Sequence, residues 1–171
     1  MRAVLLLNLV LLSLVGCGET NQQKTKTQAE QVVNDTLEIV RQRNEYKSLV
    51  DSMKGNLKSV QRDIHGQSAE GGTIESFYDQ SDTLKKEIVY YGETGKRIIQ
   101  VYQKQGNPLL VEDTDISYKE PISAEKDIEI SSCVTDVYFL DDKQHLIQWL
   151  KDGREIPESQ YKEQEKKIIM E

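Results

Sequence analysis

Short apolar segments separated by turn sequences occupy the middle of the chain, and they constrain the fold more than any other feature. The segments are rich in β-branched and aromatic residues, which favours strands. The turns between them are only a few residues long, whereas parallel pairing needs a crossover of a dozen or more residues. We therefore expect an antiparallel β-meander of five to six strands, lying near residues 74–79, 83–91, 96–104, 107–118, 127–140 and 145–151.

Both faces of this sheet should be buried. A sheet with one face in water alternates between apolar and polar residues, but here apolar side chains point to both sides. One face needs the long helix described next as its cover, and the other needs a C-terminal helix, sheet curvature or a partner. The opposed sets are Ile88, Tyr90, Ile99 and Val101 against Val89, Tyr91 and Ile98, and then Tyr138, Ile147 and Trp149 against Val137, Phe139 and Leu146.

A long amphipathic helix is predicted over residues 27–66. Thr27 and Glu30 have the spacing of a capping box, and Gly66 stands where a left-handed C-terminal cap belongs. Two arrangements remain open: the helix packs on its own sheet, bent at Gly55, or it forms a coiled-coil oligomer. The heptad a and d positions are apolar apart from two, and they are Ala29, Val32, Thr36, Ile39, Arg43, Tyr46, Val50, Met53, Leu57, Val60 and Ile64.

A short helix is expected at the C-terminus, where Pro157 can open a charged helix that runs through Ile169. The predicted fold class is α+β, with a long N-terminal amphipathic helix packed on an antiparallel β-meander and a short C-terminal helix. The meander domain with its C-terminal helix is expected to occupy residues 67–171.

The N-terminal segment differs from the rest of the chain. One basic residue, Arg2, precedes an apolar run from Ala3 to Val15, which has the layout of a secretory signal and is too short for a permanent membrane span. The run ends in Leu14-Val15-Gly16-Cys17, which resembles the lipobox of bacterial lipoproteins. The resemblance implies a signal peptide at 1–16 and acyl chains on Cys17. Residues 18–26 contain no large apolar side chain, so a solvated, lipidated tether is expected over 17–26.

The same resemblance implies a location. A lipidated Cys17 would hold the protein at a membrane of the cell envelope, because two acyl chains give a stable anchor. Gly18 stands where, in the enterobacterial scheme, an aspartate retains lipoproteins at the inner membrane, so an outer-membrane location is expected in a Gram-negative host, on either face. The net charge of −7 opposes nucleic acid as a partner. The expected partner is an envelope protein or a glycan.

No catalytic, metal or cofactor site is predicted. Gly92 to Lys96 lacks the spacing of a phosphate-binding loop and fits a hairpin turn instead. The expected turn at 141–143 places His145 beside the turn and Cys133 about seven residues before it, which is too far for a nucleophile and its base. Cys133 is therefore expected to be a small buried residue with an inert thiol. His65 and His145 have no ligand-type residues at metal-binding spacing.

Three functions remain open from the sequence. The leading one is a non-catalytic binding or accessory module held at the membrane. The second is a structural protein that oligomerises through its long helix, with a monomer favoured over this oligomer, and the third is a hydrolase. Aromatic residues on the strands could stack on glycan rings or receive a peptide, although such residues more often form the core; they are Tyr90, Tyr91, Tyr102, Tyr138 and Trp149.

The lipid anchor can be tested at Cys17. Replacing Cys17 by Ser removes the thiol that carries the acyl chains, so we expect a variant that is either released from membranes or accumulates as an unprocessed precursor. Membrane fractionation and the mass of the N-terminal peptide measure the two outcomes. A Cys17→Ser chain that matures and fractionates like the wild type would show that the lipobox interpretation is wrong.

Overall fold

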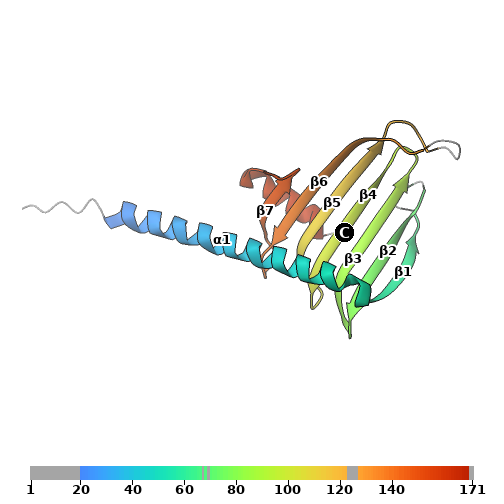
Figure 1. Cartoon of the computed structure of the whole chain (residues 1–171). Coiled ribbons are helices and arrows are strands. Elements are labelled where there is room, and N and C mark those ends of the chain that lie inside the picture. The colour runs from blue at the N-terminus through green and yellow to red at the C-terminus, as the bar shows by residue number, and fades with distance from the viewer. Residues whose placement is uncertain (1–19, 67, 69, 123–126, 170–171) are drawn as a thin grey trace, which may run out of the picture. The chain divides into compact units, whose positions relative to one another are not determined.

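The computed structural model describes residues 20–66, 68, 70–122 and 127–169. Eight antiparallel strands follow one another in sequence order as a single meander, and two helices accompany them (Figure 1). The α+β class is confirmed, whereas the expected five to six strands were too few. The helices are α1 (Thr20–Met53) and α2 (Tyr161–Ile169), and the strands are β1 (Lys58–Ile64), β2 (Gly72–Asp79), β3 (Asp82–Gly92), β4 (Gly95–Lys104), β5 (Asn107–Tyr118), β6 (Ile130–Leu140), β7 (Leu146–Lys151) and β8 (Arg154–Glu155).

Turn chemistry sets the register of the meander. Gln105 and Gly106 both have positive φ, and so do Asp152 and Gly153. Two central residues with positive φ form a type I′ turn, whose twist matches that of the flanking strands. Gly95 is required for another reason, because a Cβ there would lie 2.3 Å from the carbonyl oxygen of Ile116. At the two type I′ turns the chain reverses direction within two residues, so the flanking strands pair antiparallel without a crossover.

The predicted helix over 27–66 is wrong at both ends. The helix begins at Thr20 and ends at Met53. Residues 20–26, which belong to the expected tether at 17–26, are therefore helical. A 3-10 turn at Lys54–Asn56 contains Gly55, and the following segment becomes β1, which pairs with β2 from Lys58 to Ile64. Pairing with a neighbouring strand has overridden a helix-compatible pattern. Residues 1–16 and Cys17 lie outside the described part of the chain.

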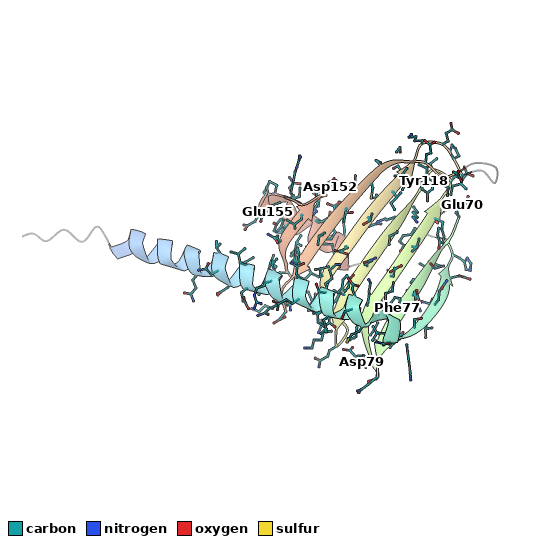
Figure 2. All side chains as sticks on the ribbon, in the orientation of Figure 1. Glu70, Phe77, Asp79, Tyr118, Asp152 and Glu155 are labelled. Carbon is teal, nitrogen blue, oxygen red and sulfur yellow. The ribbon has the colours of Figure 1, made fainter. Side chains whose placement is uncertain are left out.

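The chain divides into two compact units, residues 1–35 and 36–171, and the second contains the whole sheet. Within this second unit, α1 crosses one face of the sheet and α2 lies on the other (Figure 1). Side chains project from both faces (Figure 2). No described helix has an apolar stretch that could cross a bilayer.

The core beneath α1 confirms part of the predicted helical stripe. Tyr46, Val50 and Met53 pack here, and Val50 is fully buried. Leu57 packs on the same cluster, although it lies beyond the helix. Val60 is instead exposed on β1. The strands contribute Leu84, Tyr102, Leu110, Val137, Phe139, Ile147 and Leu150.

The core beneath α2 explains why the opposite face is apolar as well. Tyr161 is buried at the start of α2 and Ile168 packs near its end, so the predicted C-terminal helix does cover this face. Leu146 and Ile147 lie on the faces opposite to those predicted, because a register shift between Phe139 and Leu140 changes the alternation. The strands contribute Ile64, Ile74, Ile88, Tyr90, Ile99, Val101, Val111, Tyr138, Leu140, Leu146 and Trp149.

Packing of α1 on the sheet can be tested with two neighbouring residues. Val50→Ala removes buried methyl groups and leaves a cavity, so we expect a loss of about 2 kcal/mol in the free energy of unfolding. Leu49→Ala removes a larger side chain that is 53% exposed, and it should change stability less. Urea unfolding measures both. A greater loss for Leu49→Ala would contradict the packing of this helix face.

Candidate functional site

A cavity of about 520 Å³ lies on the α2 side of the sheet and is the best candidate for a binding site. Its volume is within the range of sites that hold small ligands. Its walls come from β3 to β6, from the turns after β4 and β6, and from α2. The aliphatic part of the lining consists of Ile88, Ile99, Val101, Pro108, Val111, Leu140 and Ile168.

One end of the cavity carries polar groups that have no partner among the described residues. Lys86 on β3 lies directly opposite Val101 on β4, and Gln103 is the next lining residue along β4. Gln103 is only 5% exposed. Within the described part of the chain, no hydrogen bond is made by its side-chain amide or by Lys86.

The amide of Gln103 must therefore face the cavity. Every side-chain nitrogen or oxygen atom that is fully shielded from solvent has a hydrogen-bond partner among the described residues. The Gln103 amide has none, so its atoms remain accessible, and the cavity that this buried residue lines gives that access. A buried amide with an open donor and acceptor is costly unless water or a ligand satisfies it.

The other polar groups of the lining are already engaged. Arg97 donates two hydrogen bonds to the carboxylate of Asp113, from Nε to Oδ1 at 2.9 Å and from Nη2 to Oδ2 at 2.7 Å. This two-point geometry is typical of strong arginine–carboxylate pairs. Gln164 on α2 donates to the hydroxyl of Tyr138 at 2.7 Å. Burial raises the pKa of Tyr138, and the nearby carboxylates of Asp136 and Asp113 add to the effect.

The charge of the lining is opposite to that of the chain. The lining contains three basic side chains, Lys86, Arg97 and Lys167, and one acidic side chain, Asp113, in a protein whose net charge is −7. Asp113 neutralises Arg97, and Lys167 lies 3.7 Å from the exposed Glu163. Lys86 is therefore the lining cation that has no partner among the residues that the structure describes. The cavity thus combines an aliphatic floor with a positive end.

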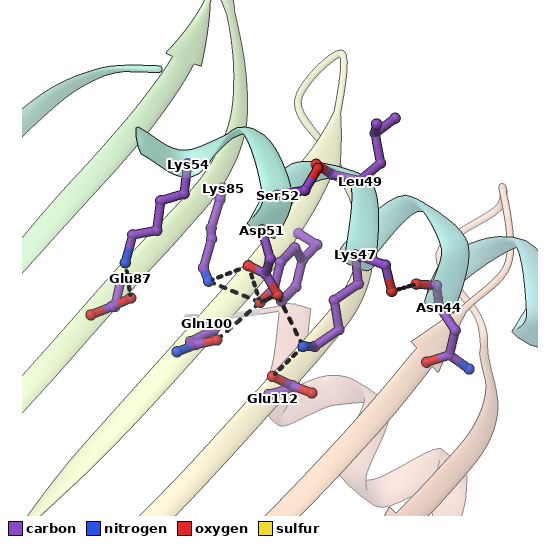
Figure 3. A network of polar contacts seen from close by, with 12 residues as sticks. Asn44, Lys47, Leu49, Asp51, Ser52, Lys54, Lys85, Glu87, Gln100 and Glu112 are labelled. Carbon is purple, nitrogen blue, oxygen red and sulfur yellow. Dashed lines mark hydrogen bonds and ion pairs between the residues drawn. The ribbon is translucent and has the colours of Figure 1, made fainter. Parts of the chain in front are cut away.

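A second polar cluster lies on the opposite face, between α1 and the sheet (Figure 3). The ammonium of Lys85, whose side chain is 4% exposed, donates to Asp51 at 2.9 Å and to the hydroxyl of Tyr102 at 2.8 Å. That hydroxyl lies 2.9 Å from Asp51 Oδ1. Lys47 reaches Asp51 at 3.1 Å and Glu112 at 3.6 Å. Each charge has an opposite charge beside it, so the cluster ties α1 to β3, β4 and β5.

The pKa shifts in this cluster keep its groups in their ordinary charge states near neutral pH. Partial burial alone would raise the pKa of Asp51, but hydrogen bonds from Lys85, Lys47 and Tyr102 outweigh it and lower the pKa. Burial raises the pKa of Tyr102, and its hydrogen bond to Asp51 raises it further. For Lys47, the contacts with Asp51 and Glu112 outweigh burial and raise the pKa. The pKa shifts therefore keep Asp51 and Lys47 charged and Tyr102 neutral, which preserves the contacts that hold α1 on the sheet.

The five aromatic residues considered for a binding surface mostly pack in the core and do not gather on one face. Tyr90, Tyr138 and Trp149 belong to the core on the α2 side, where the rings of Tyr138 and Trp149 are 5.6 Å apart. Tyr102 is fully buried beneath α1. Tyr91 is 43% exposed. Of the five, only Tyr138 lines the cavity.

The remaining residues singled out in the sequence have separate environments. Cys133 is exposed on β6, so the expectation of a buried cysteine is wrong; residue 133 comes before the stretch of β6 that packs into the core. His145 lies 3.3 Å from Asp141 at the turn before β7. Gly92 and Gly95 flank the turn of the β3–β4 hairpin. No group of three metal-ligating side chains occurs within the described ranges.

The cavity residues Lys86, Gln103 and Asp113 were not predicted as a site. The available signal was the appearance of polar residues on a face otherwise formed by residues such as Ile88 and Val111. Such residues at strand positions are ordinarily solvated, so the pattern becomes informative only when α2 is known to cover that face.

Comparisons of the chain with protein-family models, with curated protein sequences and with solved structures found no match.

The polar cluster beneath α1 predicts a pH-dependent contribution to stability. The pKa of Asp51 is lower in the folded protein than in the unfolded chain. Its contribution is therefore present above the unfolded pKa of about 3.9 and is lost as the pH falls through the folded value. We expect Asp51→Asn to lower the free energy of unfolding by about 1–2 kcal/mol at neutral pH, with a smaller difference in acid.

Urea unfolding of both proteins at neutral and acidic pH measures this difference. Asp35→Asn, at an exposed position of α1, is the matched control and should change stability little at either pH. Equal losses for the two variants, or a loss for Asp51→Asn that does not depend on pH, would contradict the role of the cluster.

Proposed function

We propose that the protein is a membrane-anchored accessory module of the cell envelope that binds a small ligand, without catalysis, in the cavity between the sheet and α2. The observation that carries this proposal is the side chain of Gln103, which is almost completely buried and whose amide has no partner among the described residues. The lipobox-like sequence ending at Cys17 supports the anchor.

The fold of the cavity is consistent with a binding role. Most of its walls are strands of one continuous sheet, whose backbone is fixed by hydrogen bonds to neighbours on both sides. Rigid walls reduce the conformational entropy lost on binding. The engaged pairs Arg97–Asp113 and Gln164–Tyr138 hold their own side chains in place, which leaves the aliphatic floor and the Lys86 end to contact a ligand.

A second candidate is oligomerisation through α1. Val33 and Leu37 are each 57% exposed, and their spacing places them on the same side of the helix. Exposed apolar residues at this spacing are suited to a helix–helix contact. This stripe differs from the one that packs on the sheet, so an oligomer through α1 and ligand binding in the cavity are compatible.

Filling the cavity tests the binding role. Val101→Phe adds a ring to the cavity lining, whereas Val89→Phe makes the same change at a half-buried valine outside the lining. We expect a neutral photoreactive long-chain alcohol, added to membranes that contain the full chain, to label cavity-lining peptides in the wild type and in Val89→Phe. Val101→Phe should lose most of this labelling.

Mass spectrometry of the labelled peptides measures the result. Equal labelling of Val101→Phe and the wild type would show that the cavity is not the site, and labelling confined to peptides of α1 would favour the helix as the interaction surface.

A further inference from the structure

We propose that the cavity ligand is a free long-chain carboxylate, held with its head group at Lys86 and Gln103 and its alkyl chain along the aliphatic floor. This inference rests on the proposed binding function, since it names the class of ligand for the same site. It depends on three features of the lining: a cation and an amide that have no partner within the described part of the chain, and an apolar surface beside them.

The position of the head group follows from which cations are free. Arg97 is held by Asp113 through two hydrogen bonds, so an anion there would compete with a carboxylate already in place. Lys167 is largely exposed and lies near Glu163. Lys86 has no such neighbour within the described part of the chain. A ligand anion therefore gains most beside Lys86.

Gln103 completes the head-group site. Lys86 lies opposite Val101 on the neighbouring strand, and Gln103 is two residues further along β4. A carboxylate has two oxygen atoms, and it can accept a hydrogen bond from an ammonium group at one and from an amide N–H₂ at the other. A cationic head group would meet repulsion from Lys86, and a neutral hydroxyl would leave the charge of Lys86 without a partner.

The chain of the ligand has a matching surface. Ile88, Ile99, Val101 and Val111 come from three adjacent strands and form the middle of the lining. An alkyl chain lying on them would remove apolar area from water on both sides. The cavity of about 520 Å³ suits a single chain rather than a two-chain lipid.

Competition against the photoreactive alcohol tests the ligand class. Dodecanoate, dodecanol and dodecyltrimethylammonium have the same chain and differ in head-group charge. We expect dodecanoate to displace the probe from the full-length wild type at about tenfold lower concentration than dodecanol, since a charge-assisted hydrogen bond is worth about one decade of affinity. The ammonium compound should be the weakest competitor.

Variants locate the head group. Lys86→Met keeps an unbranched side chain that is one atom shorter and removes its charge, so the advantage of dodecanoate over dodecanol should disappear while the probe still labels the cavity. Gln103→Leu should reduce that advantage severalfold. Lys167→Met is the matched control, because it removes another lysine of the same lining, and it should leave the advantage unchanged. Each competitor partitions equally into the membranes of all variants, so partitioning cancels when the dodecanoate-to-dodecanol ratio is compared between variants. A change in that ratio therefore reports on the binding site.

The outcomes separate the two proposals. If the probe labels the cavity of the wild type but not that of Val101→Phe, and dodecanoate competes no better than dodecanol, the ligand class is wrong and the binding function stands. If Lys167→Met loses the advantage and Lys86→Met keeps it, the head-group position is wrong. If Val101→Phe is labelled like the wild type, the binding function itself fails.

Discussion

The structure depends on one constraint: a single antiparallel sheet that is apolar on both faces must be covered on both faces. Because successive residues of a strand point to opposite sides, each central strand supplies one set of side chains to the core beneath α1 and another to the core beneath α2. α1 meets this requirement with apolar contacts and with the ion pairs of Asp51. α2 is only nine residues long, and the cavity lies beside it.

Much of the fold was predictable because its signals are local. The six segments predicted to be strands correspond to β2 through β7. Short turns such as Asp152-Gly153 also imply that the strands on either side of them pair antiparallel. The segment 58–64 was not predictable in the same way, because Val60 and Ile64 also fit a helical repeat. Only the pairing with β2, which is a tertiary interaction, decides between the two.

The candidate site was much less predictable than the fold. Lys86, Gln103 and Asp113 come to line one cavity only through strand register, and the position of α2 turns an apolar sheet face into that cavity. The buried state of Gln103 has no sequence signal, since glutamine on a strand is ordinarily exposed. The β-bulge between Phe139 and Leu140 shows the same limit, because one extra residue reversed the faces expected for Leu146 and Ile147.

Tyr102 and Gln103 are adjacent in sequence and serve opposite faces, one in the tie to α1 and the other in the cavity. The number of β4 residues ahead of Tyr102 therefore decides which face of the sheet each of these two side chains occupies. Inserting or deleting one residue ahead of Tyr102 would exchange the faces of these side chains, whereas a change of two residues would preserve them. Among divergent sequences with this fold, length differences within β4 ahead of Tyr102 should accordingly fall on even numbers, unless a compensating bulge is present.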